Sequence, residues 1–135
     1  MRLVLDADVL IGALDGSDPH HAHARRLFSS WHSEGAERLV SVINLSEVLV
    51  APATHPRSLR TAREAIAALG VMIHQPGEAI GIDAARLRGA HPVSLPDAYC
   101  LATARHTRSV VMSFDRRLIR TARAEGIAVD RDGGQ

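Results

Sequence analysis

The sequence contains no lysine, and all sixteen of its basic residues are arginines. This absence excludes Schiff-base catalysis, a Walker A loop and any phosphate clamp that depends on an ammonium group. Arginine remains well suited to bidentate contacts with phosphate. A phosphate-binding site in this chain would therefore be built from guanidinium groups.

Aromatic residues, cysteine and long apolar runs are also scarce. Aromatic residues make up 3% of the chain, too few for a platform on which single-stranded bases stack. Cys100 is the single cysteine, which excludes an internal disulfide and a thiolate metal cluster within one chain. No apolar run approaches the roughly 20 residues of a membrane span, and no signal-peptide pattern opens the sequence. We therefore expect a cytoplasmic protein that does not associate with membranes.

Short apolar runs alternate with helical patterns along the 135 residues. The runs predicted to be strands are residues 3–5, 38–43, 71–74, 109–113 and 126–129. This alternation predicts an α/β fold, in which helices cover both faces of a central parallel sheet of about five short strands. We expect one domain over residues 1–130, followed by a polar, glycine-containing and flexible tail over residues 131–135.

Four acidic residues are predicted to lie near one edge of this sheet. They are Asp6 at the end of the first strand, Glu47 and Asp97 in the first turns of helices, and Asp115 just after the fourth strand. Strand-to-helix turns of a parallel sheet share one edge, so the acids can converge there if the helix of Asp97 also starts at that edge. Converging carboxylates repel each other unless a cation neutralises them. Oxygen ligands favour Mg²⁺ or Mn²⁺ over zinc.

Most of these acids also have a local structural explanation. The pairs Asn44/Glu47 and Ser94/Asp97 have the spacing of a capping box, and Asp115 fits an N-cap. Only the acid that ends the first strand has no stabilising role of its own. The metal-site interpretation therefore depends on the whole set of acids.

Four segments carry a family resemblance, and they cover nearly the whole chain in the family's order. They are Leu3–Ile11, Ser41–Val48, Leu95–Ala104 and Val110–Leu118. Together they resemble the PIN-domain ribonucleases of the VapC toxin type. The resemblance implies a PIN fold and a metal-dependent endoribonuclease that hydrolyses RNA phosphodiester bonds and leaves a 5′-phosphate and a 3′-hydroxyl.

The resemblance also implies roles for individual residues. Asp6, Glu47, Asp97 and Asp115 would form the catalytic quartet that holds one or two Mg²⁺ or Mn²⁺ ions. Asp8 stands where the family often has a small polar residue, and its contact with metal, direct, through water or absent, stays open.

Three further residues are candidates for contact with RNA phosphates. Ser113 falls where the family usually has threonine or serine, and Arg116 and Arg117 directly follow the last acid of the quartet. An arginine in that place can hold a phosphate beside the metal.

The family pattern further implies partners. The protein would be the toxin of a type II toxin–antitoxin pair that inhibits translation by cleaving tRNA or rRNA. It would form a homodimer and bind a VapB-like antitoxin, whose C-terminal segment occupies the acidic cleft. Operator DNA would be contacted only through the antitoxin.

Two other interpretations of these acids are a catalytically silent PIN-like binding module and a phosphatase. Asp6 and Asp8 after an apolar strand are similar to the opening motif of haloacid-dehalogenase-like phosphatases, in which the first Asp is the nucleophile. That class normally has Thr or Val where this chain has Leu10, and it needs a lysine that the chain lacks.

The histidines His20, His21 and His23 form a dense cluster. They have neither an i,i+4 histidine pair nor a cysteine partner, so the pattern does not favour a zinc site. We expect them on an exposed first turn of the second helix.

Overall fold

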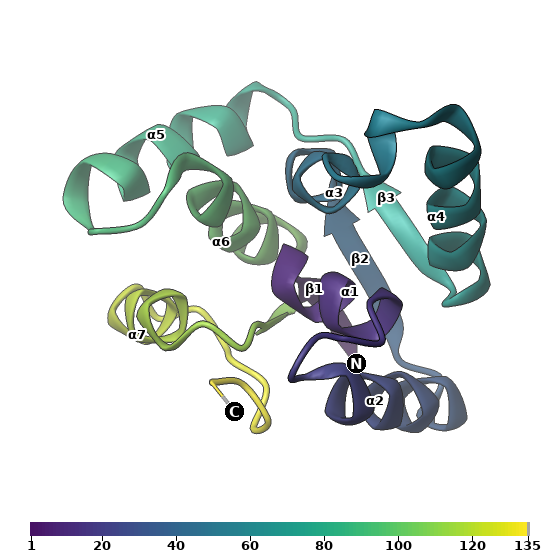
Figure 1. The fold of residues 1–135 in the computed structure, drawn as a ribbon. Helices are drawn as coiled ribbons and strands as arrows, with labels where there is room; N and C mark the ends of the chain where they lie inside the picture. Colours follow the sequence, from purple (N-terminus) through teal and green to yellow (C-terminus); the bar gives the residue numbers. More distant parts are fainter. Residues whose placement is uncertain (135) are drawn as a thin grey trace.

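The computed structural model describes residues 1–134, which form a parallel sheet flanked by helices (Figure 1). In chain order the elements are β1 (Arg2–Leu5), α1 (Ala7–Leu14), α2 (His21–Glu34), β2 (Glu37–Ser41), α3 (Val42–Leu49), the 3₁₀ helix η1 (Pro52–Thr54), α4 (Pro56–Ala68), β3 (Val71–His74), α5 (Glu78–Ala90), α6 (Leu95–Thr107), β4 (Val110–Met112) and α7 (Arg116–Ala124). The predicted α/β architecture is confirmed.

The four strands pair in the order β3-β2-β1-β4, and every pairing is parallel. The fifth strand predicted over residues 126–129 is not formed. That segment contributes a single bridge, between Val111 and Val129, and the chain then turns at Asp130, whose carboxylate accepts a hydrogen bond from the Asp132 amide. The sheet therefore has β4 as one edge strand and β3 as the other.

Alternate side chains of β1 enter two separate cores. Leu3 and Leu5 pack with α1, α2 and α3, whereas Val4 packs with α5, α6 and α7. Figure 1 shows α5, α6 and α7 on one side of the sheet and α2 and α4 on the other. Because both faces are covered, Leu3, Val4 and Leu5 of the central strand are fully buried, as their continuous apolar run predicts.

A capping side chain decides where the second strand ends. The Ser41 hydroxyl accepts a hydrogen bond from the Ile43 amide, so α3 begins at Val42 and the predicted strand over residues 38–43 is too long. Asp6 caps α1, which begins at Ala7, so the expectation that this acid has no structural role of its own is wrong. Among residues 1–134, the structure contains no helix with the length and apolarity needed to cross a membrane.

The chain end turns back onto the sheet edge as far as it is described. The Gly134 amide donates to the Ser113 carbonyl at 2.8 Å, and Arg116 Nε donates to the Gly134 carbonyl at 3.3 Å. Residue 135 lies outside the described residues, and the flexibility expected for residues 131–135 stays a prediction.

The two leucines of α6 offer a matched test of the core. Leu101 is fully buried, whereas Leu95 is 49% exposed on the same helix. We expect Leu101→Ala to lower the free energy of unfolding by about 2–5 kcal/mol and Leu95→Ala by less than about 0.5 kcal/mol, measured by urea denaturation. Equal losses in the two variants would contradict this packing.

Candidate active site

The carboxyl edge of the sheet gathers five acidic side chains. Asp6 follows β1 directly, Asp8 lies in the first turn of α1, Asp97 lies in the first turn of α6, and Asp115 is the N-cap of α7. Glu47 lies in the second turn of α3 and not in its first turn as predicted, because α3 begins at Val42. The helix of Asp97 does start at this edge, since Asn44 of α3 donates to the Pro96 carbonyl in its first turn at 3.1 Å.

Ser113 connects the ends of β1 and β4. Its hydroxyl donates to Asp6 Oδ2 at 2.7 Å and accepts from the Asp115 amide at 2.9 Å. The other oxygen of Asp6 accepts from the Ala7 amide at 2.8 Å. Two of the acids are thus held at one place by a single buried hydroxyl group.

Asp8 is attached to the same junction. Its Oδ2 accepts from the Phe114 amide at 3.0 Å and from the Ser113 hydroxyl at 3.4 Å. Its Oδ1 is buried and has no hydrogen-bond partner among the described residues. A buried carboxylate oxygen without a partner is costly, and a bound cation would satisfy it.

Asn44 joins Glu47 to the helix that carries Asp97. Its amide Nδ2 donates to Glu47 Oε1 at 3.3 Å and to the Pro96 carbonyl at 3.1 Å. The capping role suggested by the Asn44/Glu47 spacing is wrong, because Ser41 caps α3 and Asn44 is fully buried inside it. Its function as a bridge between two helices was missed in the sequence, because the spacing carries no signal of the second helix.

Burial and mutual repulsion raise the pKa of four of these acids. Burial raises the pKa of Asp6 well above its usual range, and the charges of Asp8 and Asp97 raise it further. Burial raises the pKa of Asp8 to about 6, although hydrogen bonds from Phe114 and Ser113 oppose the shift.

The pKa values of Glu47 and Asp97 are raised as well. Partial desolvation raises the pKa of each carboxyl, and the neighbouring charge of Asp97 or Asp115, respectively, adds to the shift. The edge of the sheet is therefore a place where added positive charge is strongly favoured.

An apolar groove opens beside this edge. It has a volume of about 670 Å³ and lies between α1, α3, η1 and α4, with apolar residues such as Ile11, Val48 and Ala62 in its walls. Glu47 and Arg57 also line it, so the groove leads directly to the acidic site.

The histidine cluster lies against the same junction, at the start of α2. His20 stacks on Phe114 with ring centroids 4.4 Å apart, and His23 packs against the same ring at 5.6 Å. The ring of His21 is within hydrogen-bond distance of the Gly12 carbonyl, at 2.8 Å. Two of the three rings thus share Phe114, and all three side chains are half-buried rather than exposed as predicted. His20 lies close enough to Asp8 for its charge to lower the pKa of that acid.

Comparison with known families identifies the architecture. Residues 3–124 match the family model described as PIN domain. The chain belongs to the PIN domain family. PIN domains are typically nucleases and generally depend on metal ions. No curated protein matches this PIN domain.

Solved structures similar to this PIN domain include toxins of toxin–antitoxin systems. A toxin–antitoxin complex from Klebsiella pneumoniae is 25% identical, with 84% of this chain and 86% of that chain covered and a TM-score of 0.67. VapC20 of Mycobacterium tuberculosis, a toxin that cleaves the sarcin–ricin loop, is 18% identical, with coverage of 93% and 96% and a TM-score of 0.73. DNA-bound VapBC from Salmonella typhimurium is also 18% identical, with coverage of 96% and 97% and a TM-score of 0.71.

The acidic edge has the donor chemistry of a Mg²⁺ site without forming a complete protein cage. Within residues 1–134, no three His, Cys, Asp or Glu side chains are arranged so that they alone could hold a metal ion. Mg²⁺ usually keeps several waters and takes only one or two carboxylates together with substrate phosphate. The oxygen-only donors and the unpartnered Asp8 Oδ1 fit such an ion.

The three candidates for RNA contact differ in their surroundings. Ser113 is fully buried, and its hydroxyl donates to Asp6 and accepts from the Asp115 amide, so its contact with RNA stays a prediction. Arg116 donates to the Gly134 carbonyl. Arg117 is exposed and lines a separate pocket on α7.

The dependence of stability on pH tests the raised pKa of Asp8. Its folded-state pKa, about 6, exceeds its ordinary value of 3.8, so the folded state binds the proton more tightly and stability falls as pH rises through this window. We expect Asp8→Asn to raise the free energy of unfolding by about 1–3 kcal/mol near pH 7 in the presence of chelator, and to have little effect near pH 4.

The matched control for Asp8 is Asp15→Asn, at the other end of α1. Hydrogen bonds from Ser17 lower the pKa of Asp15, so its replacement removes a favourable interaction and no stabilisation is expected near pH 7. Urea denaturation at both pH values measures the difference. A gain in the Asp15 variant that equals the gain in the Asp8 variant would overturn this account.

Proposed function

We propose that the protein is a Mg²⁺- or Mn²⁺-dependent endoribonuclease that leaves a 5′-phosphate and a 3′-hydroxyl. The observation that carries this proposal is the set of acids whose pKa values are raised at one sheet edge of a PIN domain. Stabilising an ionised cluster of this kind requires a cation, and a cation beside a phosphodiester supplies the chemistry of hydrolysis.

In this proposal Asp6, Glu47, Asp97 and Asp115 hold one or two ions, and Asp8 acts from the neighbouring position. A divalent cation, when bound, would polarise the phosphate and lower the pKa of a water molecule. Ser113 keeps Asp6 oriented through its 2.7 Å hydrogen bond. Asn44 keeps Glu47 beside α6, so that acids from different helices face the same phosphate.

We further propose that the protein is the toxin of a toxin–antitoxin pair, with tRNA or rRNA as substrate. The similar structures titled as toxin–antitoxin complexes support this role. The groove between α1, α3 and α4 is suited to an apolar segment of a VapB-like antitoxin, whose end would then reach Glu47 and the acidic site. Operator DNA would be bound through that antitoxin.

A homodimer is also part of the proposal. The edge strand β3 leaves Met72 and Ile73 50% and 52% exposed, which is unusual for consecutive apolar residues at a sheet edge. A second copy of the chain would cover such an edge.

The alternative function is a PIN-like module that binds partners without catalysis. Membership of the PIN family removes the phosphatase interpretation, but a silent module would have the same fold. The two remaining functions differ in what the acids do, and substitution of Asp6 separates them.

RNA cleavage tests the role of the acids directly. We expect Asp6→Asn and Asp97→Asn each to lower the rate of Mn²⁺-dependent RNA cleavage on the order of 100-fold or more. Glu64→Gln, an exposed acid on α4, is the charge-matched control and is expected to retain the wild-type rate. Cleavage that survives chelation, or that survives both active-site substitutions, would refute the mechanism.

Metal binding can be measured without any substrate. We expect saturating Mn²⁺ to raise the midpoint of thermal unfolding of the wild type by on the order of 5–10 °C, because the ion binds the folded state and relieves the repulsion between carboxylates. The rise should be retained in Glu64→Gln and largely lost in Asp97→Asn. Equal shifts in all three proteins would indicate that the ion binds elsewhere.

A further inference from the structure

A second pocket lies along α7, next to the acidic edge but separate from it. It has a volume of about 560 Å³ and is lined by His91, Pro92, Arg117, Arg120, Thr121 and Ala124. The four residues from α7 have the spacing of one helix face, and they extend over roughly 10 Å of that helix. The pocket begins beside the acidic edge, because the Arg117 amide donates to Asp115 Oδ1 at 2.8 Å.

The charge of this pocket is positive. Neither Arg117 nor Arg120 forms an ion pair with a carboxylate within residues 1–134, and no acidic residue lines the pocket. Both side chains are exposed and one helical turn apart. Two free guanidinium groups on one face form a suitable site for phosphate oxygens, with which arginine makes bidentate contacts.

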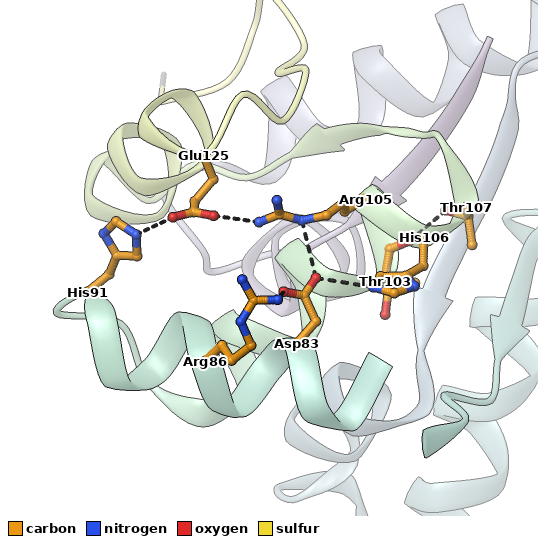
Figure 2. Close-up of polar contacts among 8 residues, drawn as sticks. All are labelled: Asp83, Arg86, His91, Thr103, Arg105, His106, Thr107 and Glu125. Atoms are coloured by element: carbon orange, nitrogen blue, oxygen red, sulfur yellow. Dashed lines mark hydrogen bonds and ion pairs between the residues drawn. The ribbon is translucent and has the colours of Figure 1, made fainter. Parts of the chain in front are cut away.

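The opposite wall of the pocket is held in place by a chain of charged residues. Figure 2 shows Glu125 between His91 and Arg105: its two carboxylate oxygens lie 2.6 Å from His91 Nε2 and 2.6 Å from Arg105 Nη2. Arg105 Nε in turn lies 3.1 Å from Oδ2 of the buried Asp83 on α5. These linked ion pairs fix the loop after α5, which carries His91, to the end of α7.

The charge of Glu125 does not cancel the positive charge of the pocket. The carboxylate is bound on both sides by Arg105 and His91, and it faces the smaller cavity on the α5 side, which Asp83 and Arg86 also line. Arg117 and Arg120 therefore keep their charges for a ligand outside the protein.

We propose that this pocket is a backbone subsite for substrate RNA, in which Arg117 and Arg120 bind the phosphate groups of the strand just outside the acidic site. This inference rests on the proposed nuclease function, because it takes RNA as the substrate that the acidic edge cleaves. No Phe, Tyr or Trp lines the pocket, and its one imidazole, that of His91, is held by Glu125. The pocket therefore binds the strand through its phosphates, without regard to sequence. It compensates for the acids, which would otherwise repel the strand.

An RNA strand suits this pocket better than an acidic protein segment does. The positive face starts at the acid that is proposed to hold the metal and continues along α7, as a strand crossing the acidic edge must do. An apolar groove for a protein segment is already present on the other side, between α1, α3 and α4.

The test compares two arginines of α7. Arg120→Gln removes a charge from the pocket, and Arg123→Gln removes the same charge from an exposed position of the same helix that does not line it. Each is combined with Asp6→Asn so that the RNA is not cut. The probe is a fluorescent oligouridylate of about a dozen nucleotides, and its binding is titrated by anisotropy at several salt concentrations. Circular dichroism and thermal unfolding check that each variant is folded.

We expect Arg120→Gln to weaken binding about fivefold and to reduce the slope of log K against log salt by about 0.7, while Arg123→Gln changes both quantities little. Arg120→Lys should recover part of the affinity, because it keeps the charge and loses the planar fork. These results would support the subsite.

Three outcomes would overturn it. The first is an equal loss of RNA affinity in the two glutamine variants, and the second is no measurable binding of the oligouridylate by the Asp6→Asn protein. The third is unchanged RNA binding by Arg120→Gln together with lost binding of polyglutamate, which would assign the pocket to an acidic protein. The readout is binding rather than cleavage. If Arg120 contributes to RNA binding but the wild-type protein cleaves no RNA, the subsite proposal stands and the nuclease proposal fails. If the wild-type protein cleaves RNA but both glutamine variants bind it equally well, the nuclease proposal stands and the subsite proposal fails.

Discussion

Repulsion among carboxylates at one edge of the sheet is the constraint on which the rest of this structure depends. Asp6 and Asp8 are largely removed from water, and the charges around them raise their pKa values further. Such a cluster lowers the stability of the folded state at neutral pH, because each ionised group is held near others of the same sign. The fold tolerates it because the two cores on either side of the sheet fix the strands from which the acids project.

Hydrogen bonds from a few uncharged groups keep the acids in place without neutralising them. Ser113 holds Asp6 and the start of α7 together, and Asn44 holds Glu47 against the first turn of α6. The hydrogen bonds from these donors offset only part of the rise in the pKa values of Asp6 and Glu47, so the edge still favours added positive charge. Positive charge lies nearby on α7, where the guanidinium groups of Arg117 and Arg120 line one face of the helix. The acidic edge thus adjoins both the apolar groove, which Glu47 lines, and the arginine pocket, whose first residue Arg117 donates its amide to Asp115.

Much of this arrangement could be predicted from local patterns. Short apolar runs separated by helical periodicities indicate a parallel sheet whatever the details of packing, and acids at the ends of those runs must share one edge. The less accurate predictions concern boundaries. The sequence pattern indicates Asn44 as the cap of one helix, whereas in the structure Ser41 caps that helix and Asn44 lies inside it. Residues 126–129 have the composition of a strand, but only one of them pairs with β4.

By itself, then, the sequence determined the class of the fold and the acids of the candidate site, because both follow from spacing along the chain. Tertiary structure alone decided which polar side chain serves which partner. Ser113 forms a buried link between the ends of two strands, and His91, far from α7 in the sequence, is part of the wall opposite Arg120. Contacts between distant segments depend on how the helices pack across the sheet, and no local pattern encodes that geometry.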